Sequence, residues 1–228
     1  MLLIVTPLQT EFEALALALK EQVSGNDRLI GRLPTIDFPG LGFCLARGGH
    51  GKVQFAVHTQ YLLERTPKVR SVICAGVAGA LDVKLKFGEI VLASETIEHD
   101  YKERFDRMPL PRFPGDPKLL SSLKVKKFSS GLTRFRIHVG IIASGDEDII
   151  SPKRARQLRR ETKAIAVAWE GAGCARVCRF YEKRFLEVRS ITDHANASSS
   201  SDFKTHLIRA MRNIAALLTA RIENAGAP

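Results

Sequence analysis

Residues Ser71 to Ser94 read SVICAGVAGALDVKLKFGEIVLAS, and the rest of the chain can be organised around this stretch. The apolar run Val72 to Ala75 predicts a buried strand. Residues 76–80 have almost no side-chain volume and predict a turn, and Glu89 to Ala93 predicts a second strand. A strand that ends in small residues lets a ligand approach the backbone, and open α/β sheets bind ligands at strand carboxyl ends. The stretch therefore predicts either a ligand-binding loop or a tight turn between packed elements.

The length and composition indicate an ordinary globular protein. The chain has 228 residues, of which 45% are hydrophobic and 26% charged, enough for one large domain over residues 1–228. No segment reaches the roughly 18 apolar residues of a membrane span. The amino terminus is apolar for only a few residues and does not resemble a signal peptide. We therefore expect a cytoplasmic protein without a membrane partner.

The four cysteines do not form the pattern of a disulfide framework. Cys174 and Cys178 are four residues apart, on one face of a predicted helix, and could ligate a metal. No second pair or nearby histidine completes such a site, so we expect buried thiols and no metal.

The net charge of +11 raises nucleic acid as a partner. The basic residues concentrate in residues 124–127 and 153–160, without a helix-turn-helix signature, zinc-finger spacing or interleaved aromatics. Lysines and arginines on solvent-exposed faces of helices and loops account for the positive net charge, and we do not expect a nucleic-acid partner.

Patterns along the chain predict alternating strands and helices. Thr10 to Glu13 has capping-box spacing ahead of a helix. The predicted strands are residues 1–5, a hairpin-like pair within 28–47, 137–143, 164–168 and 185–191. The predicted helices are 12–20, 53–65, 118–127, 152–161, one that opens within 169–173 and ends at 180, and 203–224. Residues 195–201 predict a small polar loop.

Several segments, in one order along the chain, resemble the purine nucleoside phosphorylase superfamily, and most of all its methylthioadenosine/S-adenosylhomocysteine nucleosidases. The segments are Ala75 to Gly79 with Leu85 to Val91, Gly49 to Val53, His99-Asp100, Ser144 to Asp146, Trp169 to Gly171 and Thr192-Asp193. The resemblance implies one α/β domain with a twisted mixed central sheet flanked by helices. It also implies a purine nucleoside as substrate, a homodimer, and no metal or organic cofactor.

The resemblance assigns chemistry to three carboxyl groups. Glu11 matches the glutamate that holds the attacking water, Glu170 the one that binds the ribose 2′- and 3′-hydroxyls, and Asp193 the general acid. Each has a structural alternative: Glu11 and Glu170 as acids at helix starts, and Asp193 as a turn or cap residue.

The resemblance also implies the remaining substrate-binding residues. Val77, Ala78 and Gly79 form the ribose-side loop, Ile149 presents backbone groups to the purine edge, and Phe203 lines the pocket. Three candidates depart from the family pattern. Trp169 stands in place of methionine, Asp148 in place of an aromatic that stacks on the base, and His50 in place of an apolar residue near the 5′ substituent. Ala168 also departs, because it replaces a glutamate.

Breaking an N-glycosidic bond requires an acid near the base and a nucleophile below the sugar. Asp193 has to hold a proton near neutral pH, so we expect its site to be desolvated. We therefore predict a nucleoside hydrolase that acts on a 5′-substituted adenosine. A phosphorylase would need arginines and a serine around phosphate, and Val77 replaces the usual hydroxyl or thiol. A non-catalytic nucleoside-binding protein is the third reading, supported by Asp148, Ala168 and His50.

Overall fold

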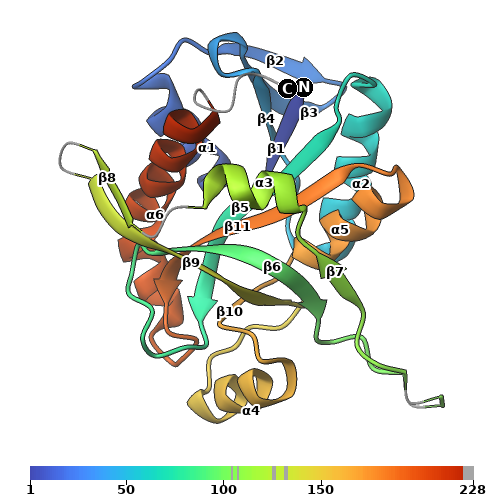
Figure 1. Cartoon of the computed structure of the whole chain (residues 1–228), viewed down its shortest axis with the longest axis vertical. Helices are drawn as coiled ribbons and strands as arrows, with labels where there is room; N and C mark the ends of the chain where they lie inside the picture. The colour runs from blue at the N-terminus through green and yellow to red at the C-terminus, as the bar shows by residue number, and fades with distance from the viewer. Residues whose placement is uncertain (104, 107, 125–126, 131–132, 223–228) are drawn as a thin grey trace.

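The computed structural model describes residues 1–103, 105–106, 108–124, 127–130 and 133–222. Strands and helices alternate along much of the chain (Figure 1). In chain order they are β1 (Leu2–Thr6), α1 (Gln9–Lys20), β2 (Asn26–Ile30), β3 (Leu33–Phe38), η1 (Pro39–Leu41), β4 (Phe43–Arg47), α2 (Gly51–Arg65), β5 (Ser71–Ala80), β6 (Ile90–Glu98), β7 (Arg112–Pro114), α3 (Pro117–Leu123), β8 (Lys127–Ser130), β9 (Thr133–Ser144), α4 (Pro152–Thr162), β10 (Ala166–Ala168), α5 (Gly171–Phe180), β11 (Arg184–Asp193) and α6 (Ser199–Ile222).

The strands form one mixed sheet in the order β10-β9-β6-β11-β5-β1-β4-β3-β2, with β7 and β8 added at β6 and β9. β5 lies in the middle and runs parallel to β1 and β11. β10 pairs with β9 and also, antiparallel, with β5. This second pairing closes β5, β11, β6, β9 and β10 into a ring, so that strands distant in sequence end near one another.

Two helical layers cover the sheet (Figure 1). α1 and α6 pack on one side, where Leu15 and Leu218 share a core cluster with Ile73 of β5. α2 and α5 pack on the other side, where Leu62 and Cys178 share a second cluster with Val72. Neighbouring residues of β5 face opposite layers, as strand geometry requires, and both layers are apolar.

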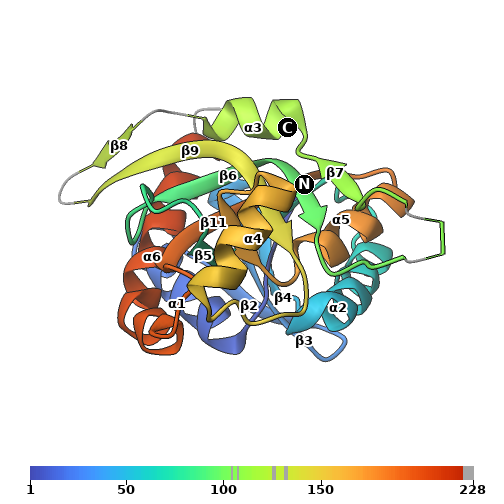
Figure 2. The same cartoon turned by 90° about the horizontal axis from the view of Figure 1, so that it is seen from below.

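α4 covers one end of the strand ring (Figure 2). Its buried residues Ala155 and Leu158 pack against Ala143 of β9 and Val167 of β10. The helix begins at Pro152 and is otherwise basic, as its sequence predicts.

The predicted turn at residues 76–80 is wrong, because β5 continues to Ala80. Val77 and Ala78 pair with β11, and Gly79 and Ala80 pair with β10. The glycines and alanines among them are poor strand formers, so pairing with two neighbouring strands determines the conformation. Gly76 is required by close packing: a Cβ there would lie 2.7 Å from both Arg189 Nη1 and Glu11 Oε1.

Two expectations near the amino terminus also differ from the structure. The capping box at Thr10 is wrong: α1 begins at Gln9, and the Glu11 carboxylate accepts the Leu8 N–H at 2.9 Å. Residues 28–47 lie in three strands, β2, β3 and β4, instead of one pair. The two turns that connect these three strands come at Gly31 and Gly42, both with positive φ.

The other predicted strands and helices agree with the structure to within about five residues, and α5 (Gly171–Phe180) ends at the predicted residue. The short strands β7 and β8 were not predicted, and Lys127 of the predicted short helix lies in β8. α6 begins at Ser199, so part of the predicted loop at 195–201 is helical. Residues 223–224 of the predicted last helix and 125–126 of the short helix lie outside the described residues.

The four cysteines are buried free thiols, as predicted. Within the described ranges, no three histidine, cysteine or acidic side chains are placed to hold a metal ion. No helix in the same ranges is long and apolar enough to cross a membrane.

Candidate functional site

A cavity of about 340 Å³ lies where β1, β4, β5, β9, β10 and β11 end or approach their ends. All eleven sequence-predicted site residues line it: Glu11, His50, Val77, Ala78, Gly79, Asp148, Ile149, Trp169, Glu170, Asp193 and Phe203. Lining residues that were not predicted to bind are Leu8, Glu147, Ile150, Val167, Ala168, Arg189, Thr192, Ala195, Ser199 and Ser200.

Glu11 lies in the first turn of α1 and is 1% exposed. Its Oε1 accepts the Val77 N–H at 2.7 Å, and its Oε2 accepts the Leu8 N–H at 2.9 Å. Burial and, secondarily, the charge of Glu170 raise the pKa of Glu11 to about 7, although Arg189 acts in the opposite direction. This carboxyl can therefore exchange a proton near neutral pH, which is the condition for a general base.

Glu170 precedes α5 and is also buried. The Gly51 N–H at the start of α2 donates to its Oε1 at 3.3 Å, and Arg189 Nη2 lies 3.2 Å from its Oε2. Burial raises the pKa of Glu170, while Arg189 and the Gly51 amide work against that shift. One of its two oxygens is thus bound by a cation, and the other faces the amino terminus of α2.

Arg189 and Glu187 complete this buried group, which we call the inner cluster: Glu11, Glu170, Glu187 and Arg189. Arg189 Nε donates to Glu187 Oε1 at 2.8 Å, and both residues are at most 1% exposed. The sequence pattern places both only within the predicted strand at residues 185–191. Their spacing of two residues in that strand was the available signal, because it places both side chains on one face.

Asp193 is the last residue of β11. Its Oδ1 accepts the Ala195 N–H at 2.9 Å and the Ser199 hydroxyl at 2.7 Å, and the Thr192 hydroxyl donates to Oδ2 at 3.1 Å. Gly79 lies against it, since a Cβ there would be 2.8 Å from Oδ1. The side chain is partly exposed, so the expected desolvation of Asp193 is incomplete.

His50 and Trp169 form an aromatic wall beside Glu170. Their rings stack with centroids 4.3 Å apart, and His50 Nδ1 lies 3.7 Å from Glu170 Oε1. The Ser144 hydroxyl fixes the Trp169 backbone by donating to its carbonyl at 2.6 Å, and it also accepts the Ala172 N–H at 2.9 Å. Phe203 of α6 is partly buried against the core.

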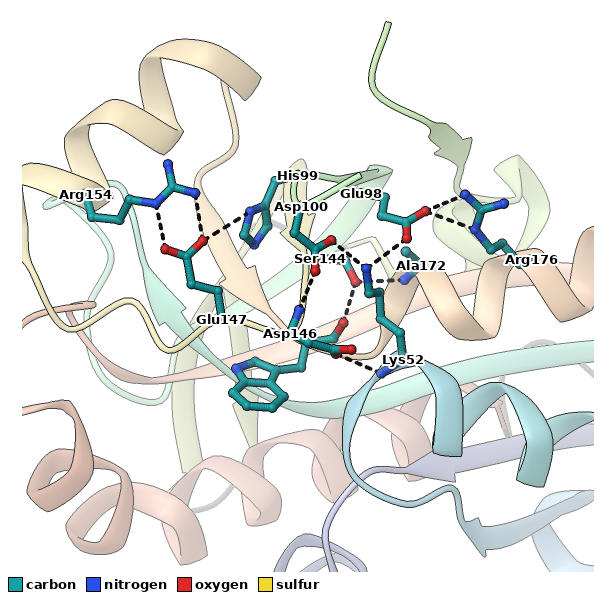
Figure 3. Close-up of polar contacts among 11 residues, drawn as sticks. Lys52, Glu98, His99, Asp100, Ser144, Asp146, Glu147, Arg154, Ala172 and Arg176 are labelled. Carbon is teal, nitrogen blue, oxygen red and sulfur yellow. Dashed lines mark hydrogen bonds and ion pairs between the residues drawn. The ribbon is translucent and has the colours of Figure 1, made fainter. Parts of the chain in front are cut away.

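A second network, the outer cluster, holds the loop after β9 (Figure 3). It consists of Lys52, Glu98, Asp100, Asp146 and Arg176. Lys52 Nζ lies 2.9 Å from Glu98 Oε1 and 2.5 Å from Asp100 Oδ1. Asp100 Oδ2 accepts the Asp146 N–H at 2.8 Å, and Asp146 Oδ1 accepts the Lys52 N–H at 2.9 Å. These contacts tie the start of α2 to the loop that carries Asp148 and Ile149.

Within that loop the neighbouring side chains differ in exposure. Glu147 accepts two hydrogen bonds of 2.7 Å from Arg154, which lower the pKa of its carboxyl (Figure 3). Asp148 is exposed and Ile149 is buried. The loop therefore presents Ile149 to the cavity as an apolar surface, with Asp148 at the rim.

The chain matches the family model described as "Phosphorylase superfamily" over residues 2–223. It is 31% identical over 185 residues to the 5′-methylthioadenosine/S-adenosylhomocysteine nucleosidase of Shewanella denitrificans, covering 77% of this chain and 79% of that protein. For the nucleosidase of the same name from Psychromonas ingrahamii the identity is 32%, with coverage of 79% and 80%.

Solved structures agree in fold. The nucleosidase from Neisseria meningitidis in complex with methylthio-immucillin-A aligns with a TM-score of 0.83 at 26% identity, over 98% of both chains. The futalosine hydrolase of Helicobacter pylori aligns with a TM-score of 0.82 over 98% of this chain and 97% of that one, at 22% identity, and shows the fold alone. The resemblance seen in the sequence is thereby confirmed, and the chain belongs to the phosphorylase superfamily as a relative of its methylthioadenosine/S-adenosylhomocysteine nucleosidases.

Proposed function

We propose that this protein is a nucleosidase that hydrolyses the N-glycosidic bond of a 5′-substituted adenosine and releases adenine and the sugar. The observation that carries the proposal is the placement of Glu11, Glu170 and Asp193 around one cavity in three different environments. Glu11 is fully buried and has a pKa of about 7. Glu170 is paired with Arg189, and Asp193 is partly exposed and accepts hydrogen bonds from neighbouring N–H and hydroxyl groups.

Each environment suits one part of the reaction. Ionised Glu11 accepts a proton from water while the water oxygen bonds to C1′, and the C1′–N bond breaks toward the base. Asp193 gives its proton to a purine nitrogen, so the base leaves neutral. Glu170 accepts hydrogen bonds from the ribose hydroxyls. No metal or cofactor takes part in this scheme.

The other lining residues hold the nucleoside in place. The backbone of Val77, Ala78 and Gly79 lies below the sugar, with no side chain larger than valine in the way. Ile149 offers backbone groups to the purine edge, while Trp169 and Phe203 pack against the nucleoside. Substrate binding then excludes water from the partly exposed Asp193 and completes its desolvation.

A phosphorylase is the principal alternative, and Arg189 argues against it. Among the cavity-lining residues that the structure describes, Arg189 is the one arginine. Its N–H groups already face Glu187, Glu170 and the Val77 carbonyl. Phosphate would also have to bind beside Glu11 and Glu170, where the carboxylate charges repel an anion.

The deciding experiment measures adenine release from 5′-substituted adenosines with and without phosphate. We expect turnover that is independent of phosphate and a free sugar as product. Turnover that rises in proportion to phosphate and yields a sugar 1-phosphate would establish a phosphorylase. Tight nucleoside binding without base release would establish a binding protein.

We also propose that the protein is a cytoplasmic homodimer. Four buried free thiols suit a reducing compartment. Val53 and Val57, exposed by 75% and 59%, are one turn apart on α2, directly after the cavity residue His50. A second copy covering these valines would meet the cavity rim. Light scattering on the protein and on a Val53→Glu/Val57→Glu variant tests this, since the variant should be monomeric.

A further inference from the structure

Glu187 is a buried carboxylate for which the proposed chemistry has no direct use. It is 0% exposed in the middle of β11, whose alternate residues Leu186 and Val188 face the core packed by α6. Its two oxygens are both occupied, because Arg189 Nε donates to Oε1 at 2.8 Å and the Thr96 hydroxyl donates to Oε2 at 2.6 Å. A buried carboxylate is expensive unless it is paired and hydrogen-bonded, and Glu187 is both.

Residues from three elements contact the Glu187 side chain or leave room for it. Thr96 comes from β6, Arg189 from β11 itself, and Gly171 from the first residue of α5. A Cβ at Gly171 would lie 2.1 Å from Glu187 Oε2, so only glycine leaves room for the carboxylate there. The amino terminus of α5, with its partial positive charge, also favours an acid at this place.

Arg189 connects Glu187 to the cavity. With Nε directed at Glu187, Nη2 reaches Glu170 Oε2 at 3.2 Å and Nη1 reaches the Val77 carbonyl at 3.3 Å. Nη1 and Glu11 Oε1 both lie against Gly76, where a Cβ would be 2.7 Å from each. The guanidinium is planar, so fixing Nε also fixes how the other two nitrogens face Glu11 and Glu170.

Besides the orientation of the Arg189 guanidinium, its positive charge also affects the ionisation of Glu11. A cation beside Glu11 favours the ionised form and weakens it as a base. Glu187 places a negative charge on the far side of the same guanidinium, and so offsets part of that effect.

We propose that Glu187 is a positioning residue for the hydrolysis: it orients Arg189 and offsets its charge, so that Glu11 remains a strong enough base to activate water at neutral pH. This inference deepens the proposed function and rests on it. Glu187 is 0% exposed, does not line the cavity, and acts through Arg189.

The test is Glu187→Gln, which keeps the shape and an acceptor for Arg189 Nε but removes the charge. We expect the acid limb of the kcat/KM pH profile to move to lower pH by about one unit, the size of the effect of one nearby charge. On the plateau above that limb, kcat should fall, by at most about tenfold, because a carboxylate that is less basic by one pKa unit is a poorer proton acceptor. Glu187→Asp keeps the charge but retracts it from Nε, so it should lower kcat while leaving the acid limb near its wild-type position.

Two controls separate this role from a structural one. Thr96→Val removes only the hydroxyl that donates to Glu187, so it should reduce thermal stability without moving the acid limb. Glu95→Gln, on the same strand, removes a carboxylate paired with Arg112 at 2.6 Å that does not line the cavity, and should change neither. If Glu187→Gln changes only stability, as Thr96→Val does, the proposal is wrong.

A second measurement does not depend on turnover. ¹³C NMR of carboxyl-labelled protein gives the titration of Glu11, identified by the resonance lost in Glu11→Gln. The midpoint should fall in Glu187→Gln even if the enzyme proves to act on another substrate, which separates this inference from the proposed function. An unchanged midpoint overturns it. If Glu187→Gln does not fold, Glu187→Asp provides the test. A reduced kcat in that variant supports the proposal, and an unchanged kcat overturns it.

Discussion

The inner and outer clusters both contact the amino terminus of α2, and the pKa values of their carboxyl groups shift in opposite directions. In the inner cluster three carboxyl groups share one arginine, and the pKa values of Glu11 and Glu170 are raised. In the outer cluster burial alone would also raise the pKa of Asp100, but Lys52 and the Asp146 amide lower it below its ordinary value.

The difference comes from the balance of charge and donors. Glu98 has two cationic partners, Lys52 and Arg176, and Asp100 has a cation and a backbone N–H. Glu11 has two backbone N–H groups but an acid as neighbour. Asp100 is partly exposed, and its pKa is lowered by Lys52 and the Asp146 amide. Glu11 is fully buried beside another acid, so burial outweighs its two donors and keeps a proton available for chemistry. The predictions below test this contrast, beginning with the largest expected effect.

Removing the two carboxyl groups that we propose take part in the reaction, those of Glu11 and Asp193, should have the largest effect. Glu11→Gln and Asp193→Asn should each reduce kcat by roughly 10²–10⁴-fold, the usual cost of losing general acid–base catalysis. Both residues line the cavity, so thermal unfolding should remain cooperative in each variant. Steady-state kinetics and calorimetry measure the two quantities. Near-normal turnover in either variant would remove that residue from the mechanism.

The raised pKa of Glu11 should be visible in both activity and stability. Glu11 has to be ionised to act as a base, so kcat/KM should show an acid limb near pH 7 and be on the order of 100-fold lower at pH 5. The folded state holds this proton more tightly than the unfolded state does. The stability from Glu11 is therefore fully present below pH 4.5 and is lost as pH rises through about 7.

Denaturant unfolding from pH 4 to pH 8 measures that loss, which is on the order of 3 kcal/mol for a shift of this size. Glu11→Gln should abolish it, because glutamine does not titrate. If wild type and variant have parallel pH–stability curves, Glu11 does not carry the shift.

The outer cluster should respond in stability more than in catalysis. Lys52→Met leaves Asp100 with one donor fewer and should cost about 2 kcal/mol, roughly a 30-fold change in the folding equilibrium. Because the loop after β9 loses its anchor, KM should rise while kcat stays nearly constant. The pKa of Asp100 is lowered, so its contribution is present above the ordinary value of 3.8 and is lost as pH falls through the folded pKa, opposite in sign to Glu11.

Lys20→Met is the matched control. Lys20 pairs with Asp27 at 2.7 Å on the surface, with the two side chains 36% and 69% exposed. Surface pairs of this kind contribute about 0–1 kcal/mol, so this variant should hardly change stability or KM. Equal losses in both variants would mean that the outer cluster is an ordinary surface network.

Much of this architecture could be predicted from the sequence, because the strands are apolar and the helices are periodic. Glu11, Glu170 and Asp193 were located because each follows a predicted strand and matches a family motif. All three line the cavity.

The inner cluster as a set could not be predicted, since its contacts depend on sheet register. Arg189 meets Glu11 and Glu170 only because β11 lies parallel to β5 with Arg189 opposite Gly76. The Glu187 carboxylate has room only because the residue that faces it, the first residue of α5, is Gly171. The extension of β5 through Gly79 was missed for the same reason, because its partner β10 is distant in sequence.

The smallest expected effect concerns His50, which lies at the junction of the two clusters. It precedes α2, its Nδ1 is 3.7 Å from Glu170 Oε1, and its side chain is 54% exposed. In the proposed binding mode Glu170 accepts the ribose 3′-hydroxyl on C3′, and the adjacent C4′ bears C5′ with its substituent, so that substituent should cover the imidazole. Asp148 adds a second polar side chain at the cavity rim.

A methylthio group offers no hydrogen bond, and burying an unpaired polar group costs on the order of 1–3 kcal/mol. We therefore expect kcat/KM to be at least about tenfold lower for methylthioadenosine than for an adenosine with a hydrogen-bonding 5′ group, such as a carboxylate or amine. 5′-Deoxyadenosine and adenosine serve as references for the missing and minimal substituent. His50→Leu should reverse the preference by replacing the polar edge with an apolar one, while kcat for 5′-deoxyadenosine changes little. If methylthioadenosine is instead the better substrate by tenfold, the imidazole stays in water when substrate binds, and the contrast between the clusters does not extend to the 5′ side of the cavity.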